Sequence, residues 1–244
     1  MDQTSRSATI SHTPSYLTAS FLTWNVEGLK RNMFSLKNYT DLESPDFVFL
    51  SEPQIFSSDL AYCMSPFRGE YSCELNSAEK CDPLLAMTRT RAHGGVLVMW
   101  KKSLDKYVSV YPVDSPSFLP VVYSPPGSPI SVHIALYLPT SGKEAEFIET
   151  ITLLSNTIDD INEKYESCLI FIRGDGNVNP NNSDRMVVFS SFTSAFNLVQ
   201  IPIKHKTYHH FLGGGAFDSN IDVILHSRDV PNMESVSTIY FLYL

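Results

Sequence analysis

The stretch Phe-Ile-Arg-Gly-Asp-Gly-Asn, residues 171–177, begins apolar and ends in polar side chains that carry oxygen atoms. The stretch Thr-Trp-Asn-Val-Glu-Gly-Leu, residues 23–29, has a similar arrangement, and Leu50-Ser51-Glu52 closes a third apolar run. In α/β sheets, ligands and catalytic groups collect at the C-terminal ends of the strands. The sequence therefore predicts one oxygen-lined pocket at these ends, of a kind that suits a hard divalent cation and a phosphate.

Short runs of β-branched and aromatic residues, bounded by Gly, Pro, Asn or Asp, predict strands at 21–24, 47–50, 96–100, 132–137, 168–172 and 221–225. Several of these runs are apolar almost throughout, which indicates burial on both faces. The clearest helix is predicted at 143–164, with its apolar residues on one stripe. Weaker helical patterns cover 30–42 and 184–196.

Strands and helices interleave without a linker, charge run or internal repeat, so we expect one domain over 20–244. It follows a Ser- and Thr-rich leader at 1–19 that is predicted to be disordered. The Pro-rich segment 111–129 is predicted to be an extended excursion on the surface. The expected fold class is α/β: a four-layer sandwich of two packed mixed β-sheets flanked by helices.

Five short motifs occur in a familiar order and spacing: Trp24–Leu29, Glu52, Tyr137-Leu138-Pro139, Gly174–Asn177 and Ser219–Asp222. Together they resemble the endonuclease/exonuclease/phosphatase superfamily, and most of all the apurinic-like endonuclease domain of LINE-type (non-LTR) retrotransposons. The resemblance covers about residues 20–230. It implies a deoxyribonuclease I-like fold and hydrolysis of the phosphodiester backbone of DNA with Mg²⁺, for which Mn²⁺ can substitute. It is also compatible with a reverse transcriptase that lies downstream in a longer parent protein.

The resemblance also implies roles for individual residues. Glu52 is the principal Mg²⁺ ligand, with Asn25 and Glu27 beside it, and Asn25 also contacts the substrate phosphate. Asp175 positions or deprotonates the attacking water, and Asn177 holds that water against the phosphate. From the residues alone, Asn25 and Glu27 flank Val26 and would point to the same side of a strand. Local alternatives are a salt bridge for Glu52 and a turn-forming role for Asn25.

Further along the chain, the resemblance places the Tyr137 hydroxyl on the scissile phosphate, and Asp222 orients a catalytic histidine. Thr207 and Ser219 match positions of a hairpin that meets DNA in the retrotransposon enzymes. The alternatives are a core aromatic with a satisfied hydroxyl for Tyr137 and a glycine loop without function at 213–215.

The catalytic histidine belongs to a Ser-Asp-His motif, but this sequence contains no Asp-His dipeptide. His226 follows Asp222 by four residues on the predicted strand, so it should lie roughly 13 Å away at ~3.3 Å per residue. We expect the chain to be cut short before the last strand of the domain. Three functions compete: an active endonuclease, a catalytically dead fragment with at most weak nucleic-acid binding, and a phosphatase acting on a small phosphoester.

The chain has 244 residues, of which 43% are hydrophobic and 18% charged, as in ordinary globular proteins. No apolar run approaches the roughly 18 residues needed to span a bilayer, so no membrane partner is expected. Its cysteines, Cys63, Cys73, Cys81 and Cys168, form no CxxC pair, which argues against a zinc site. Without a signal-peptide core we expect free thiols and a nuclear or cytoplasmic location, not secretion.

The net charge of −8 differs from the basic footprint that is usual for DNA-binding domains. An acidic total still allows a local basic face. Two clusters are candidates for it: Lys101, Lys102 and Lys106, and Lys204-His205-Lys206. For each cluster taken alone, solvated loop charges are the favoured interpretation.

Overall fold

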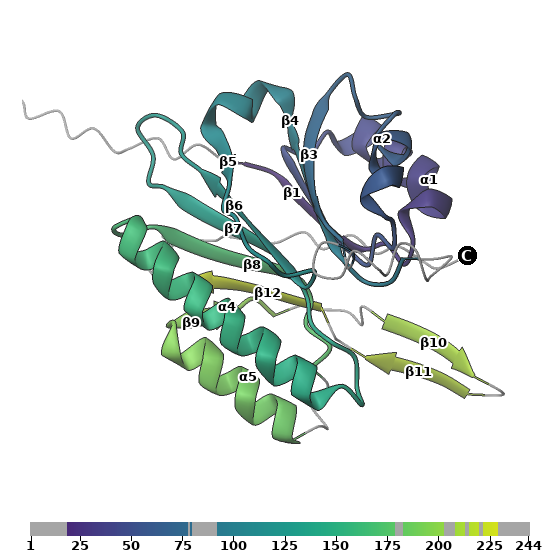
Figure 1. Cartoon of the computed structure of the whole chain (residues 1–244). Coiled ribbons are helices and arrows are strands. Elements are labelled where there is room, and N and C mark those ends of the chain that lie inside the picture. The colour runs from purple at the N-terminus through teal and green to yellow at the C-terminus, as the bar shows by residue number, and fades with distance from the viewer. Residues whose placement is uncertain are drawn as a thin grey trace, which may run out of the picture.

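The computed structural model describes residues 19–77, 79, 92–178, 183–202, 208–212, 215–219 and 222–228. Two β-sheets pack face to face, and helices cover the outer face of each (Figure 1). The chain therefore has the predicted four-layer α/β sandwich. Residues 1–18 of the leader predicted at 1–19, and the expected chain end at 229–244, lie outside the described residues.

The first sheet has the strand order β1-β2-β4-β3. Its strands are β1 (Phe21–Asn25), β2 (Phe47–Ser51), β3 (Tyr71–Asn76) and β4 (Val96–Lys101), with α1 (Leu29–Glu43) and α2 (Leu60–Cys63) packed on the outer side. Strand β2 is buried at every position because its side chains alternate between two cores. Val48 and Leu50 belong to the core shared with α1, whereas Phe47 and Phe49 face the second sheet.

The second sheet has the strand order β5-β6-β7-β8-β12-β9. Its strands are β5 (Val108–Val110), β6 (Phe118–Tyr123), β7 (Ser131–Tyr137), β8 (Leu169–Asp175), β9 (Leu198–Gln200) and β12 (Asp222–Ser227). Its outer face is covered by α4 (Glu144–Lys164) and α5 (Ser183–Ala195) (Figure 1). The predicted apolar stripe of α4 is confirmed: Phe147, Ile151, Leu154, Ile158 and Ile161 are all buried against this sheet.

Strands β10 (Tyr208–Leu212) and β11 (Gly215–Ser219) form an antiparallel hairpin outside both sheets, which extends away from the sandwich (Figure 1). Short 3-10 helices cover Ser57–Asp59 and Lys102–Tyr107. Within the described part of the chain, no helix is both long and apolar enough to cross a bilayer.

The prediction of a surface excursion at 111–129 is wrong. This segment contains β6, which is buried at every position and lies between β5 and β7. Pro120 is tolerated inside β6, where its carbonyl oxygen accepts a hydrogen bond from the Tyr111 N–H. Leu119, Val121 and Tyr123 pack against the first sheet, and Phe118 and Val122 belong to the core beneath α4 and α5. This burial on both faces outweighs the cost of a proline in a strand.

Candidate active site

Three of the predicted residues meet where their strands end. The Nδ2 atom of Asn25, the last residue of β1, donates to Glu52 Oε1 at 3.1 Å and to Asp175 Oδ2 at 2.9 Å. Glu52 directly follows β2, and Asp175 is the last residue of β8. One amide thus bridges two carboxylates that come from different sheets.

Tyr137 and Asp222 flank Asp175 within the second sheet. Tyr137 pairs with Asp175 across the parallel β7–β8 ladder, and Asp222 pairs with it across the antiparallel β8–β12 ladder. Residues directly opposite in neighbouring strands point to the same face of a sheet. The structure therefore brings Asn25, Glu52, Tyr137, Asp175 and Asp222 together at one edge of the sandwich.

The backbone around Asp175 is held by contacts beneath the site. The Ser51 hydroxyl donates to the Leu136 carbonyl at 3.0 Å and accepts from the Asp175 N–H at 3.2 Å. Gly174 has φ 139°, and a Cβ at this position would lie 2.0 Å from the Leu136 carbonyl oxygen. The close approach that this glycine permits is therefore to β7.

Asn177 lies just beyond β8 in a left-handed backbone conformation, with φ 45°. Its N–H donates to Asp175 Oδ1 at 2.9 Å, and its Nδ2 donates to the Leu138 carbonyl at 2.7 Å. Asn177 thereby connects the loop after β8 to the loop after β7. Its predicted role in holding water remains a prediction.

The carboxyl group of Asp175 lies in an environment that opposes its ionisation. Burial raises its pKa well above the usual range, and the charges of Asp222 and Glu52 raise it further, against hydrogen bonds from the Asn177 N–H and Asn25. Burial likewise raises the pKa of Tyr137, with further contributions from Glu52, Asp175 and Glu27. The Tyr137 hydroxyl therefore keeps its proton at neutral pH and can act as a donor.

These shifts predict how stability depends on pH. Because the pKa of Asp175 is higher in the folded chain than the unfolded value of about 3.9, the folded chain binds more protons between the two values. The contribution of Asp175 to the free energy of unfolding should therefore fall as pH rises through this window. Denaturant unfolding of wild type and Asp175→Asn should show a stability difference that grows with pH from about 3.9 upward. A difference independent of pH would contradict the raised pKa.

Glu27 does not occupy the position that we expected. Strand β1 ends at Asn25, and Glu27 follows in a left-handed conformation with φ 42°. Its Oε2 lies 3.5 Å from Arg31 Nη2, and its N–H donates to Asn25 Oδ1 at 3.2 Å. The expectation that one strand carries both residues is therefore wrong, because the backbone turns into α1 after Asn25. A ligand role for Glu27 remains a prediction.

The side chains around Asp175 fit a magnesium ion. Glu52 and Asp175 both offer oxygen atoms, the charge of Glu52 acts on the Asp175 carboxyl, and a cation would relieve this repulsion. No group of three or more His, Cys, Asp or Glu side chains forms a metal cage within the described ranges. Mg²⁺ does not need one, since it usually keeps several waters and takes one or two carboxylates. Asn25 turns its amide nitrogen toward the carboxylates, so it holds them in place here.

The remaining predicted residues lie elsewhere or outside the described ranges. Thr207 lies outside them, and Ser219 is the last residue of β11 in the projecting hairpin. Asp222 and His226 occupy one unbroken strand, where His226 pairs with Phe171 while Asp222 pairs with Asp175. His226 is thus displaced along β12 from the carboxylates, as its sequence separation predicts.

The basic cluster at Lys101–Lys106 lies at the wrong end of the molecule for a site at the carboxylates. Strand β4 runs antiparallel to β2, so Lys101 follows the residue paired with Phe47, at the start of β2. Lys101 is also paired with Asp46, at 3.1 Å. The cluster 204–206 lies outside the described residues.

Sequence reasoning missed Arg185, which joins the two loops of the site from α5. This arginine is 2% exposed. Its guanidinium donates to the carbonyl oxygens of Pro139 at 2.6 Å, Thr140 at 2.7 Å and Asn177 at 3.1 Å, and to Glu144 Oε2 at 2.6 Å. The available signal was its position on the buried stripe of α5, four residues before Phe189.

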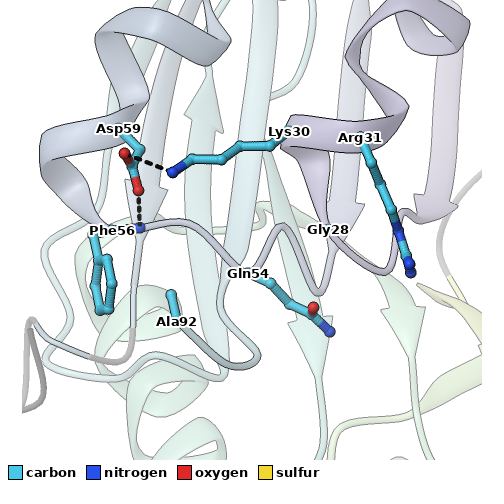
Figure 2. A pocket seen from close by; sticks show the side chains of 7 residues that line it. All are labelled: Gly28, Lys30, Arg31, Gln54, Phe56, Asp59 and Ala92. Atoms are coloured by element: carbon cyan, nitrogen blue, oxygen red, sulfur yellow. Dashed lines mark hydrogen bonds and ion pairs between the residues drawn. The ribbon is translucent and has the colours of Figure 1, made fainter. Parts of the chain in front are cut away.

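A pocket of about 370 Å³ lies between the start of α1 and the segment that follows β2 (Figure 2). Gln54 lines it and donates to Glu52 Oε2 at 3.0 Å, which connects the pocket to the site. Lys30 and Arg31 project from the first turn of α1, and Lys30 is paired with Asp59 at 2.8 Å (Figure 2). Phe56 contributes an aromatic wall. Cationic and aromatic side chains thus adjoin the carboxylate cluster.

Comparison with known proteins rests on structure, since neither a family model nor a curated protein sequence matches the chain. The AP endonuclease LMAP from Leishmania major superposes with a TM-score of 0.68 at 15% identity, covering 86% of this chain and 79% of that chain. The endonuclease domain of TRAS1, a telomere-specific non-LTR retrotransposon, gives 0.65 at 13% identity, covering 87% and 86%. The 3′ phosphatase NExo from Neisseria, bound to product DNA hairpin, gives 0.63 at 15% identity, covering 86% and 87%.

These similarities define the class of fold: a deoxyribonuclease I-like α/β sandwich, shared by nucleases and phosphatases. More narrowly, it is the fold of the endonuclease/exonuclease/phosphatase superfamily, as the sequence motifs predicted.

Proposed function

We propose that this chain is a Mg²⁺-dependent phosphodiester hydrolase that nicks DNA, derived from the endonuclease of a retrotransposon. The observation that carries this proposal is the bridge from Asn25 to Glu52 and Asp175. It brings two carboxylates together at the strand ends, on a fold that endonucleases of several kinds share.

The residues divide the work according to their environments. Asp175, whose buried carboxyl has a raised pKa, acts as the general base, because a raised pKa makes the ionised carboxylate a stronger proton acceptor. Tyr137 keeps its proton and donates to a phosphate oxygen. Asn177 orients the water through its side-chain oxygen, while its amide nitrogen holds Leu138. Mg²⁺, when bound by Glu52, supplies positive charge that stabilises the charge developing on the phosphate.

The cationic pocket supplies the contacts for the DNA strand. Arg31 has a 62% exposed side chain, and Lys30 is 53% exposed, so both can reach a phosphate. Phe56 can stack with a base at the same pocket. Lys30 is paired with Asp59 and Arg31 with Glu27, so phosphates must displace these carboxylates before the pocket can offset the net charge of −8.

The test is a nicking assay on supercoiled plasmid with Mg²⁺, with EDTA, and with Mn²⁺ in place of Mg²⁺. We expect nicking with either metal and none with EDTA, and Asp175→Asn prepared in parallel excludes a contaminating nuclease. A phosphomonoester substrate in a separate arm tests the phosphatase function. Binding without cleavage is the second candidate, favoured by the lack of an Asp-His dipeptide; DNA retention without nicking at any metal concentration would establish it and overturn hydrolysis.

Glu52→Gln should lower the nicking rate by roughly 10- to 100-fold at limiting Mg²⁺, because it weakens metal affinity. Excess Mg²⁺ should restore part of the loss. A titration of nicking against Mg²⁺ concentration measures both effects. Glu163→Gln, at an exposed position of α4, serves as the matched control and should behave like wild type. A loss that no Mg²⁺ concentration reduces would contradict the ligand role.

A further inference from the structure

A second cavity, of about 140 Å³, lies at the end of the sandwich opposite the carboxylates. It opens between the starts of β1, β7 and β8, whereas Asn25, Tyr137 and Asp175 lie at the ends of those strands. Its walls include the rings of Phe21, Tyr123, His133 and Phe171. The hydroxyl-bearing residues Ser128 and Ser131 also line it.

A chain of hydrogen bonds connects this cavity to a buried cation. Arg173 Nη1 lies 3.0 Å from His133 Nδ1, and His133 Nε2 lies 2.9 Å from Ser131 Oγ. Because a guanidinium only donates, His133 Nδ1 accepts, and the imidazole carries its proton on Nε2. The ring therefore donates to Ser131, whose own hydroxyl hydrogen can point into the cavity.

The charge of Arg173 has no carboxylate to balance it among the residues that the structure describes. The side chain is 3% exposed, and its contacts are His133 and the faces of Phe21, Phe49 and Phe171. Burial lowers the pKa of Arg173 to about 9. An uncompensated buried cation is costly, so a nearby anion would be favoured.

The hydroxyl groups that line the cavity also favour a ligand that accepts hydrogen bonds. Ser128 Oγ is buried and has no hydrogen-bond partner among the described residues. Burial and then the charge of Asp46 raise the pKa of the Tyr123 hydroxyl, which lines the cavity. The Asp46 carboxylate already accepts hydrogen bonds from the Ser20 N–H and from Lys101 Nζ. It therefore offers only a weakened repulsion to a ligand anion.

We propose that this cavity binds a small aromatic carboxylate. The rings of Phe21, Tyr123 and Phe171 flank a planar ring, and the cavity, at about 140 Å³, is close in volume to one of about 150 Å³ that holds benzene. The carboxylate accepts from Ser131 and Ser128, and its charge balances Arg173 through the His133 relay, in which hydrogen bonds polarise one another. Neither the nuclease fold nor the proposed hydrolysis requires such a site.

The experiment is calorimetric titration of the full chain with benzoate, in parallel with toluene as an uncharged ring of similar size. Benzoate should bind with a dissociation constant on the order of 1 mM, as expected for so small a ligand. Toluene should bind at least roughly tenfold more weakly, since it cannot use the hydroxyl donors. Equal affinity for the two, or no binding of benzoate, would overturn the proposal.

Variants locate the site. Ser131→Ala should weaken benzoate binding roughly tenfold by removing one hydrogen bond to a charged group, and Ser128→Phe should abolish it by filling the cavity from a loop. Ser124→Ala, at an exposed position after β6, is the matched control and should leave affinity unchanged. Arg31→Ala, in the other pocket, should also have no effect. Loss of binding in Arg31→Ala with retention in Ser128→Phe would assign benzoate to the nuclease pocket and refute this inference.

Discussion

Asp175→Asn is expected to lower the rate of plasmid nicking on the order of 10³-fold, within the range for loss of a general acid or base. The substitution keeps the shape of the side chain, and its oxygen can still accept from the Asn177 N–H, whereas its amide nitrogen cannot accept from Asn25. It removes the group that accepts a proton from water. Excess Mg²⁺ should therefore fail to restore the rate, unlike in Glu52→Gln. The measurement is the initial nicking rate of both variants across a Mg²⁺ titration.

The same substitution should raise the free energy of unfolding at neutral pH. Asp175 is 1% exposed and lies near the charges of Asp222 and Glu52, so a neutral amide removes a penalty of burial and repulsion. A variant that is more stable yet inactive cannot owe its inactivity to unfolding. Asp160→Asn, on the exposed side of α4, controls for a general effect of losing one negative charge. Equal recovery of Asp175→Asn and Glu52→Gln by Mg²⁺ would contradict the division of roles.

Much of the fold follows from patterns that the sequence displays openly. The strands β2, β4, β7 and β8 were predicted because they are apolar on both faces, which is what the inner layers of a four-layer sandwich require. Strand β3 was missed because it pairs on one side only, and its residues Ser72, Cys73 and Glu74 are partly exposed. Its run Tyr-Ser-Cys-Glu-Leu-Asn has too few apolar residues for a strand signal.

The sequence predicted those residues of the candidate site that lie at recognisable strand ends. Asn25, Glu52 and Asp175 each end or directly follow a recognisable apolar run, so their meeting could be anticipated from three short motifs. Glu27 shows the limit of this reasoning. Two residues beyond the end of β1 the backbone is left-handed, and alternation along the strand no longer says where the side chain points.

Contacts between distant segments were not predictable from local patterns. The Arg173–His133 contact joins β8 to β7 across the ladder, and each residue stands in a run that otherwise reads as an apolar strand. Arg185 likewise stands on a helix, and its partners in the loops after β7 and β8 are set only by the packing of α5. The signal in both cases is a polar residue on a buried stripe, and it does not name the partner.

Arg185→Met is expected to lower the free energy of unfolding by about 3–5 kcal/mol. Methionine fills much of the same volume and can still pack on Phe147, over which the guanidinium lies at 4.5 Å. It leaves the carbonyl oxygens of Pro139, Thr140 and Asn177 without these donors. Arg68→Met is the matched control, because Arg68 also donates to a carbonyl, that of Ala61, but from an exposed position where water replaces it. Its unfolding midpoint should stay close to wild type.

Loss of Arg185 should also disturb the site at temperatures where the variant remains folded. The guanidinium connects the loop after Tyr137 to the loop that carries Asn177, so its removal frees two catalytic segments to move relative to each other. Misplacement by about 1 Å can cost on the order of 10²-fold in rate. Arg185→Lys keeps the charge and some of the donors, so it should recover part of both losses. If Arg185→Met, shown to be folded by its unfolding curve, nicks DNA at the wild-type rate, the arginine stabilises the fold without positioning the site.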